Sequence, residues 1–364
     1  MKLGIVGLPN AGKSTLYNAI MQTGAEASNY PFSTVSPNVG RVPVPDERLA
    51  KLNEIYNAKS VVPASIEMVD IAGLVKGASQ GEGLGNQFLS HIREADALVH
   101  VVRCFEDENV SHVHDTIDPI RDIETVNLEL IFADLEMLER RLAKVQKTAR
   151  TDKSFKREEE ILTKIVETLE NGQPARSLVW DDADDLKSVE SFTLITQKPM
   201  LYAANISETD LEKNSSNDAL KKLEDFANSE NTRLFVSCAK LEAEIATLDP
   251  EEKEMFLADM GISQNGLARL ISAGYELLGL ISFLTAGPKE VRAWTVRKNS
   301  KAPQAAGKIH SDLERGFIRA EVVAFDDLVA AGTYAAAKEK GQVRIEGKEY
   351  VVKDGDVLLI RFNV

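Results

Sequence analysis

The first fifteen residues, MKLGIVGLPNAGKST, constrain the fold of this chain more than any other stretch. An apolar run from Leu3 to Val6 predicts a buried strand, and apolar residues with helical spacing follow from Leu16. Between them lies the pattern GxxxxGKS, which is typical of a loop that wraps a phosphate chain. Strand, glycine-rich loop and helix in this order predict a P-loop domain of the α/β class.

The residue types of this loop indicate its chemistry. Gly7 and Gly12 let the backbone curl closely around an anion, and the helix that follows turns its positive end toward that anion. Lys13 can reach the β- and γ-phosphates, so we expect it both to bind nucleotide and to act in hydrolysis. The Ser14 hydroxyl can ligate Mg²⁺. The expected nucleotide contacts in this loop are Asn10, Ala11, Gly12, Lys13, Ser14 and Thr15.

Two further segments predict the metal site and the part of the site that senses the γ-phosphate. The loop NYPFSTVSPN contains two prolines, and its Thr34 hydroxyl can complete the Mg²⁺ shell while a γ-phosphate is present. The strand SIEMVD ends in Asp70, which can hold a water on the metal, and the Gly73 amide can bond a γ-phosphate oxygen. We therefore expect Ser14, Thr34 and Asp70 to hold Mg²⁺ and Gly73 to serve in catalysis.

The residue after this DxxG pattern is Leu74, where many GTPases carry a glutamine that orients the attacking water. An alkyl side chain cannot align water, so hydrolysis needs another group or is slow. Several glycines between residues 77 and 85 predict a mobile second switch. His112 and His114 lie in a later polar stretch, where either imidazole could position the water or accept its proton. Solvated surface histidines without a role in catalysis are the alternative.

Two later strand ends predict how the base is recognised. The segment NISE, residues 205–208, ends one apolar strand, and SCAK, residues 237–240, follows another. A guanine-specific domain carries NKxD instead, and its aspartate accepts hydrogen bonds from the N1–H and 2-amino groups. The residues expected around the base are Asn205, Ile206, Glu208, Ser237 and Ala239.

The NISE segment departs from the guanine pattern in two places. Asn205 can still address N7, which all purines share, but Ile206 replaces the lysine that flanks the base. Glu208 is one methylene longer than aspartate, so its paired acceptor is misplaced for guanine. Adenine has an acceptor at N1 and no 2-amino group, so we expect a preference for ATP or a relaxed choice of purine.

The rest of the chain predicts a helical arm and a separate C-terminal module. From Asn127 to about Arg176, apolar residues keep helical spacing on both sides of a polar break, which predicts an antiparallel hairpin. From about Ile281, short β-like segments alternate with turn residues around an alanine-rich helix, which predicts a small α+β module. We expect a discontinuous P-loop domain over residues 1–127 and 199–280, an arm over 128–198 and the module over 281–364.

Composition and charge narrow the class of protein. The chain has 364 residues, of which 43% are hydrophobic and 27% charged, as in soluble globular proteins. No apolar run approaches the roughly 20 residues that span a bilayer, and the chain starts on a predicted core strand, so we expect a cytoplasmic protein without a membrane partner. Cys104 and Cys238 lie beside apolar strands and are expected to be buried free thiols.

The net charge of −14 argues against wrapping naked nucleic acid, so no DNA partner is expected. Residues 281–364 differ from the rest, because they hold 14 basic and 11 acidic side chains, a net charge of +3. We therefore look first to this C-terminal part for contact with an anionic partner, although a solvated surface with a small charge bias is the alternative.

The motifs GLPNAGKS, NYPFSTVSPN, DIAGLVKGASQGEGLGNQFL, NISE and SCAK together resemble the YchF, or Obg-like ATPase, family of P-loop proteins related to translation factors. The resemblance covers essentially the full chain, and NISE is its most specific element. It implies a G-domain that carries an inserted antiparallel coiled-coil arm, and a C-terminal TGS domain of the α+β β-grasp fold. It also implies hydrolysis of ATP to ADP and phosphate, and association with ribosomes through ribosomal RNA and proteins.

The resemblance also implies two roles for single residues. A histidine in the loop after the switch strands takes part in hydrolysis, and His114 fits it best. Asn10 is a feature of relatives that use K⁺ as an activating cation. We thus expect a slow, Mg²⁺-dependent ATPase switch on ribosomes. One alternative is a guanine-specific GTPase of the Obg type in which Glu208 still reaches the base, and another is a scaffold in which nucleotide is only structural.

Overall fold

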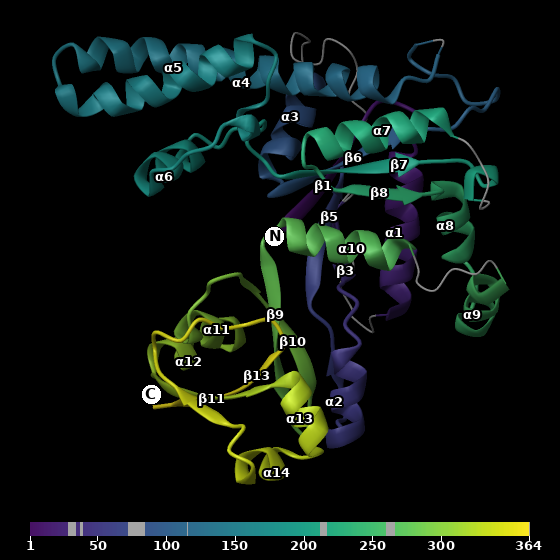
Figure 1. Cartoon of the computed structure of the whole chain (residues 1–364), viewed down its shortest axis with the longest axis vertical. Coiled ribbons are helices and arrows are strands. Elements are labelled where there is room, and N and C mark those ends of the chain that lie inside the picture. The colour runs from purple at the N-terminus through teal and green to yellow at the C-terminus, as the bar shows by residue number, and fades with distance from the viewer. Residues whose placement is uncertain are drawn as a thin grey trace. The chain divides into compact units, whose positions relative to one another are not determined.

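The computed structural model describes residues 1–27, 34–36, 39–71, 84–114, 116–211, 217–259 and 266–363 (Figure 1). These residues form two compact units. The first unit comprises the described residues within 1–23, 32–40 and 67–266. The second comprises those within 24–31, 41–66 and 267–364. Each unit has its own sheet.

The first unit is built on a seven-stranded sheet with the order β2-β3-β5-β1-β6-β7-β8. Its strands are β1 (Lys2–Val6), β2 (Thr34–Ser36), β3 (Val39–Pro43), β5 (Ser65–Asp70), β6 (Ala97–Arg103), β7 (Met200–Asn205) and β8 (Leu234–Ser237). Strands β5, β1, β6, β7 and β8 pair in parallel. Their carboxyl ends therefore share one edge of the sheet, and the P-loop leaves β1 at this edge.

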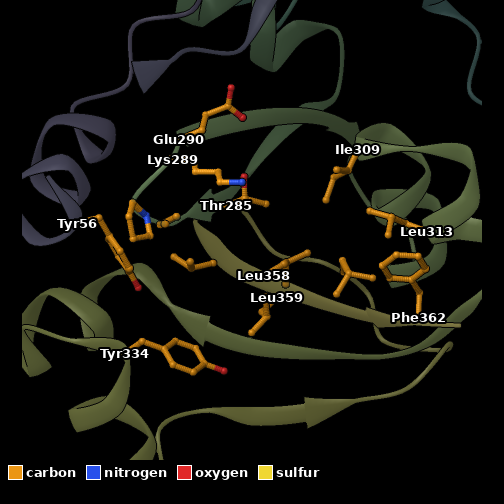
Figure 2. Close-up of a pocket in the computed structure, with 15 residues that line it drawn as sticks. Tyr56, Thr285, Lys289, Glu290, Ile309, Leu313, Tyr334, Leu358, Leu359 and Phe362 are labelled. Carbon is orange, nitrogen blue, oxygen red and sulfur yellow. The ribbon is translucent and has the colours of Figure 1, made fainter. Parts of the chain in front are cut away.

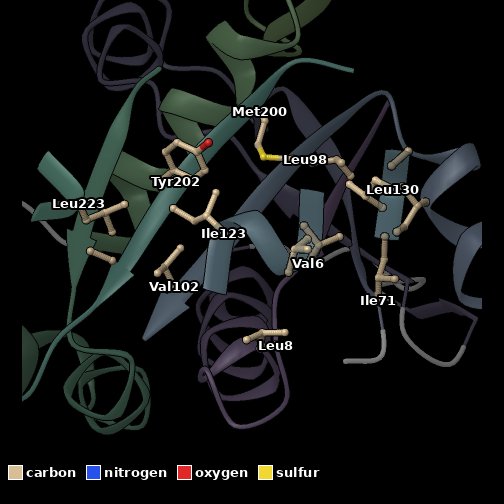
Figure 3. Packing of buried hydrophobic residues seen from close by; sticks show 14 of the residues in the cluster. Val6, Leu8, Ile71, Leu98, Val102, Ile123, Leu130, Met200, Tyr202 and Leu223 are labelled. Atoms are coloured by element: carbon tan, nitrogen blue, oxygen red, sulfur yellow. The ribbon is translucent and has the colours of Figure 1, made fainter. Parts of the chain in front are cut away.

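The central strands of this sheet are covered on both faces. Every residue of β6 and β7 is buried, as expected for parallel strands between layers of helices. Figure 3 shows the core over these strands, where Tyr202 and Val102 of the sheet lie near Ile123. The helices of this unit are α1 (Lys13–Ala27), α3 (Leu84–Glu94), α4 (Pro119–Ala149), α5 (Lys156–Glu170), α6 (Ala183–Ser191), α7 (Asp218–Ser229), α8 (Ala239–Ile245) and α9 (Pro250–Asp259). Short 3₁₀ turns are η1 (Lys153–Phe155), η2 (Ala175–Ser177) and η3 (Thr209–Leu211).

Helices α4 and α5 form a long hairpin that extends the first unit (Figure 1). Their facing sides share a second apolar cluster that includes Leu138, Ile161 and Ile165. Helix α4 begins at Pro119, several residues before the helical spacing becomes visible in the sequence. The reason is local, because Asp118 caps the first turn by accepting from the next backbone amides and proline suits the first helical position.

The second unit contains a six-stranded sheet with the order β12-β11-β13-β9-β10-β4. Its strands are β4 (Val61–Val62), β9 (Leu280–Ala286), β10 (Val291–Arg297), β11 (Phe317–Ala324), β12 (Arg344–Glu346) and β13 (Asp356–Phe362). Two antiparallel pairs, β9 with β10 and β11 with β12, flank the parallel contact between β13 and β9. The order β12-β11-β13-β9-β10 is that of a β-grasp sheet, the fold that the resemblance implies. The helices are α2 (Arg48–Tyr56), α10 (Gly266–Leu277), α11 (Ala302–Ile309), α12 (Ser311–Arg315), α13 (Phe325–Ala331) and α14 (Tyr334–Glu339).

The segment 41–66 belongs to this second unit, whereas the sequence predicts it to lie in the P-loop domain. Strand β4 pairs in parallel with the start of β10, so Val61 lies opposite Val291. The Arg48 guanidinium bridges Asp46 and Asp354, with Nη1 2.7 Å from the Asp354 carboxylate. Contacts over such separations in sequence leave no local pattern, which is why the predicted boundaries differ here.

A groove of about 800 Å³ lies between the β9–β10 turn and β13 (Figure 2). The pairing between β13 and β9 is at Val357 and Leu284, after which β13 continues to Phe362 while β9 ends at Ala286. Apolar side chains such as Leu358 line the groove. The strand register therefore accounts for this opening.

Two smaller predictions can be compared with the described residues. Cys104 and Cys238 are free and buried, which confirms the predicted thiols. In the described part of the chain, no helix is both long enough and apolar enough to cross a membrane.

Candidate functional site

The loop between β1 and α1 requires glycine at two positions. Gly7 has a φ of 148° and Gly12 a φ of 97°, both in the region that L side chains rarely adopt. A Cβ on Gly12 would lie 2.2 Å from Asn205 Nδ2, and a Cβ on Gly7 would lie 2.4 Å from the Val101 carbonyl oxygen. The loop therefore packs directly on the ends of β6 and β7, and its backbone remains free of side chains where a phosphate chain would approach.

Lys13 begins α1 directly after this loop, and its side chain is almost fully buried. Its Nζ donates to the Leu8 carbonyl oxygen at 2.7 Å. Burial lowers the pKa of Lys13 to about 8, and the nearby Asp70 carboxylate only partly opposes this shift. A phosphate oxygen would be a stronger acceptor than a carbonyl and would stabilise the ammonium form. Lys13 is therefore placed where a phosphate oxygen could replace the Leu8 carbonyl oxygen as the acceptor of its ammonium group.

Ser14 and Asp70, two of the three predicted metal ligands, are in contact. Ser14 Oγ donates to Asp70 Oδ2 at 3.0 Å. The other carboxylate oxygen, Oδ1, is buried and has no hydrogen-bond partner within the described part of the chain. A hydrated Mg²⁺ would satisfy this oxygen, since magnesium keeps several waters and takes one or two oxygen ligands from the protein. The residues present therefore fit the ion.

The described residues contain no group of three or more His, Cys, Asp and Glu side chains that could hold a metal. This is compatible with a magnesium site of the P-loop type, because its ligands are a hydroxyl, water and phosphate oxygens. The third predicted ligand, Thr34, begins β2, but its side chain is outside what the structure describes. Gly73 and Leu74 also lie outside the described residues, so their roles stay predictions.

Asn205, at the end of β7, joins the two loops that the sequence assigns to the phosphates and the base. Its Nδ2 donates to the Ala11 carbonyl oxygen at 3.0 Å, and its Oδ1 accepts from the Ala239 amide at 2.9 Å. The side chain is buried, and Nδ2 retains a second N–H for a base. Ser237 and Ile206 are buried beside it, and Ile206 belongs to the main core.

Glu208 forms an ion pair within the predicted base site. Its carboxylate lies 2.9 Å from Lys240 Nζ, and the two side chains are 45% and 73% exposed. Guanine recognition would need this carboxylate to accept two hydrogen bonds, and Lys240 competes for the same oxygens. The pair therefore further weakens the case for guanine specificity.

The loop after Glu208 depends on a residue that the sequence analysis missed. Asp210 Oδ2 accepts from the Ser207 amide at 3.1 Å and from Ser207 Oγ at 2.6 Å. It also accepts from Asn217 Nδ2 at 3.0 Å. A serine three residues before an aspartate is a known signal for such a turn and could have revealed it.

The two candidate histidines have different surroundings. His112 Nε2 lies 2.9 Å from Asp122 Oδ2, and both side chains are buried. Nδ1 lies 2.7 Å from the His114 carbonyl oxygen and 3.0 Å from the His114 amide nitrogen, so both ring nitrogens are engaged in either tautomer and His112 has a structural role. The His114 ring is half-buried and has no hydrogen-bond partner among the described residues.

Ser111 connects the histidine segment to the P-loop, and the sequence analysis did not single it out. Asn10 Nδ2 donates to the Ser111 carbonyl oxygen at 3.1 Å and lies 3.2 Å from Ser111 Oγ. Asn10 has a φ of 61°, which places it in the left-handed region that asparagine tolerates better than most residues. The structure thus brings the segment before His114 to the P-loop, and no local signal marks this contact.

Two family models match the chain. One, described as a 50S ribosome-binding GTPase (MMR_HSR1), matches residues 2–140. The other, YchF-GTPase_C, described as a protein of unknown function, matches residues 280–363. The first match includes the P-loop and also the segment 41–66 of the second unit, and the second match includes strands β9 to β13.

Relatives match over the full length. "Ribosome-binding ATPase YchF" of Bacillus subtilis (strain 168) is 57% identical and covers 99% of both chains. "Obg-like ATPase 1" of Oryza sativa subsp. japonica is 44% identical over 100% of this chain and 92% of its own. A solved structure, that of the Schizosaccharomyces pombe YchF GTPase, superposes with a TM-score of 0.90 at 39% identity and covers 99% of this chain and 97% of that one. With full-length identity of this order, the chain belongs to the YchF family.

Proposed function

We propose that this chain is a ribosome-associated, Mg²⁺-dependent ATPase that hydrolyses ATP to ADP and phosphate. Relatives that match over the full length are named ribosome-binding ATPases. The observation that carries the proposal is the base site, where Glu208 is held by Lys240 and Ile206 replaces the lysine of the guanine pattern. A ribosomal partner also implies a cytoplasmic location.

The choice between ATP and GTP needs a direct test, because the S. pombe structure and both family models carry the name GTPase. The test is equilibrium binding of Mg²⁺-ATP and Mg²⁺-GTP to the purified protein. We expect ATP to bind at least about tenfold more tightly, a difference of roughly 1.4 kcal/mol. A tenfold preference for GTP would contradict the ATPase proposal and support the conventional GTPase.

Two variants connect this preference to the base site. Lys240→Ala releases Glu208 without changing its length, and Glu208→Asp restores the shorter carboxylate of the guanine pattern. We expect the combined variant to gain affinity for GTP, since the free carboxylate can then accept from guanine. Adding Ile206→Lys completes the pattern, but Ile206 is only 3% exposed, so the melting temperature of that variant must be measured as well.

The roles proposed for hydrolysis are those that the motifs predict, and the contact between Ser14 and Asp70 supports them. Mg²⁺, held by Ser14, Thr34 and Asp70, would neutralise charge on the β- and γ-phosphate oxygens. Lys13 binds these phosphates, and the Gly73 amide bonds a γ-phosphate oxygen. His114 positions the attacking water, because the alkyl chain of Leu74 cannot.

A monovalent cation is the proposed activator. Because Asn10 Nδ2 donates to Ser111, the Asn10 side-chain oxygen remains available as a ligand beside the phosphates. We expect turnover to rise when K⁺ replaces Na⁺ and expect Asn10→Ala to lose this response. Equal turnover in the two salts would remove K⁺ from the proposal.

The helical hairpin offers a surface for ribosomal RNA. Its end carries five exposed cations for which no ion pair occurs among the described residues, and we call this set the basic hairpin end: Lys144, Lys147, Arg150, Lys153 and Lys156. Clustered Lys and Arg bind phosphate backbones largely without regard to sequence. In a chain of net charge −14, this cluster supports an RNA contact at the hairpin as well as the one expected in residues 281–364.

A further inference from the structure

We propose that Arg103 is a positioning residue for hydrolysis, because its guanidinium holds the segment 105–111 in one shape and thereby fixes His114 relative to the P-loop. The inference rests on the proposed ATPase function and on the proposed role of His114. It adds a residue that no motif in the sequence marks.

Arg103 is the last residue of β6 and lies at the carboxyl edge of the sheet. Its register partner on β7 is Asn205, the residue that joins the P-loop to the base loop. The Arg103 side chain is directed into the segment that follows, and the residue is only 3% exposed. It is therefore buried next to the site and not on the outer surface.

The guanidinium is surrounded by main-chain carbonyl oxygens of one loop. Nε donates to the Phe105 oxygen at 3.1 Å, and Nη2 donates to the Asp107 oxygen at 3.3 Å. Nη1 donates to the oxygens of Val110 and Ser111 at 3.0 and 3.3 Å. The guanidinium carbon also lies 4.5 Å from the centre of the Phe105 ring. One side chain thus fixes four points along seven residues.

The acceptors are neutral, which makes the loop dependent on this residue. Burial lowers the pKa of Arg103, although the charges of Asp107 and Asp122 act in the opposite direction. The buried N–H groups need acceptors, and only the folded shape of residues 105–111 supplies them. Conversely, those carbonyls lose their shared donor if Arg103 is removed. The Arg103 guanidinium therefore needs the folded loop for its acceptors, and the loop needs Arg103 for the donors that hold its shape.

The Ser111 carbonyl oxygen links this arrangement to the P-loop. It accepts from Arg103 Nη1 and also from Asn10 Nδ2, and a carbonyl oxygen has two lone pairs for two such donors. Arg103 and the P-loop therefore meet at one atom. Any movement of the loop that breaks one bond displaces the acceptor of the other.

Helix α4 holds the chain on both sides of His114. Before it, His112 bonds Asp122 at 2.9 Å, and after it, Thr116 Oγ1 accepts from Arg121 Nη1 at 3.1 Å. His114 thus lies in a segment anchored at the P-loop through Ser111 and at α4. Arg103 holds the first of these anchors, so it acts on His114 through the loop and does not itself touch nucleotide.

Lysine cannot replace this arrangement. Arg presents five N–H donors in a planar fork, whereas Lys has one ammonium group with three donors at a single point. Arg103→Lys therefore keeps the charge but cannot reach carbonyls spread over seven residues. The matched control is Arg176→Lys, in which a half-buried arginine of the same unit loses its bond to Asn127 at the base of the hairpin.

The experiment measures the single-turnover rate of ATP hydrolysis and the Kd of Mg²⁺-ATP for the wild type, both variants, His114→Ala, and Arg103→Lys combined with His114→Ala. We expect Arg103→Lys to slow hydrolysis about tenfold or more while the Kd stays within about threefold. Arg176→Lys should change neither quantity by more than about twofold. The double variant should be no slower than His114→Ala, because the two losses then share one cause.

Several results would overturn the proposal. These are an Arg103→Lys rate within about twofold of the wild type, a Kd that rises as much as the rate falls, or losses that multiply in the double variant. Unchanged turnover in His114→Ala would also refute the proposed role of Arg103, but it would leave the ATPase proposal intact. Absence of ATP hydrolysis in the wild type would instead refute the proposed function.

A second variant decides the case if Arg103→Lys does not fold. Phe105→Leu removes the ring against the guanidinium but keeps all four carbonyl acceptors. We expect a smaller loss of rate, about two- to fivefold, with an unchanged Kd. An unchanged rate in a folded Phe105→Leu protein would count against the proposal.

Discussion

At the scale of single residues, Lys13 shows how burial prepares a cation for its ligand. The ammonium group is held by one carbonyl oxygen, and burial brings its pKa down to about 8. A triphosphate would supply anionic acceptors and raise this pKa again. Binding of nucleotide and binding of a proton to Lys13 are therefore linked.

This linkage predicts how affinity depends on pH. Below about pH 8 the free protein already carries a protonated Lys13, so the Kd of Mg²⁺-ATP changes little there. Above about pH 8 the neutral amine must take up a proton on binding, so affinity should fall by up to about tenfold per pH unit. Titration calorimetry in two buffers of different ionisation enthalpy measures the proton taken up.

Lys13→Arg is the control, because its guanidinium stays charged over this range. That variant should bind more weakly overall, yet its Kd should not change with pH between about 7 and 9.5. A flat profile for the wild-type protein over the same range would contradict the linkage.

The residue scale also shows what the sequence could predict. Ser14 and Asp70 meet as expected, since strand and loop ends of an α/β domain converge at one edge of its sheet. The bond between Asn10 and Ser111 spans 101 residues and has no local pattern. Arg103 likewise resembles any polar residue at a strand end until its loop is seen folded around it.

At the scale of elements, one buried carboxylate holds the hairpin to the rest of its unit. Asp134 of α4 is fully buried and accepts from the amides of Ile195 and Thr196 at 3.1 and 2.8 Å. Thr196 Oγ1 donates to the same carboxylate at 2.7 Å. These bonds attach the outgoing helix to the segment that returns to β7.

Asp134→Ala should therefore destabilise the first unit. It leaves two buried amides without acceptors, and we expect a loss of about 3 kcal/mol in the free energy of unfolding. Denaturant unfolding followed by circular dichroism measures it. The control is Glu136→Ala on the same helix, whose exposed pair with Arg140 should contribute less than about 1 kcal/mol. Equal losses in the two variants would show that Asp134 is not the attachment.

Helical spacing predicts the two long helices of the hairpin, because α4 and α5 each bury a continuous apolar stripe. It does not predict Asp134, since an aspartate within an amphipathic helix normally faces water. The start of α4 is also displaced from the pattern, because the Asp118 cap and Pro119 define it and apolar spacing does not. Helices can therefore be predicted where their buried residues recur periodically. They cannot be predicted where a single polar contact fixes an end or an attachment, as Asp118 and Asp134 do.

At the scale of the whole molecule, charge is distributed unevenly. The basic hairpin end lies in the first unit, whereas the sequence directed attention to the C-terminal residues with their net charge of +3. The local density of exposed cations matters more than the net charge of a domain for binding phosphates. Each Lys or Arg that contacts a phosphate releases counterions from the nucleic acid.

Charge reversal separates these two surfaces. We expect Lys144→Glu, Lys147→Glu and Arg150→Glu together to weaken co-sedimentation with ribosomes about tenfold or more and to reduce its salt dependence. The matched control reverses three exposed lysines of the second unit: Lys338, Lys340 and Lys348. If only this control weakened binding, the C-terminal module would be the contact, and the hairpin would have another use.

Two strands cross the boundary between the units, and this limits how the gene can be divided into fragments for expression. Strand β3 starts in the first unit and ends in the second, while β5 starts in the second and ends in the first, at Asp70. A stop codon placed after residue 280 would deprive Val61 and Arg48 of their partners, and a gene fragment starting there would lack them too. No single cut yields two intact units, so neither unit can be expressed whole from one continuous piece of the gene.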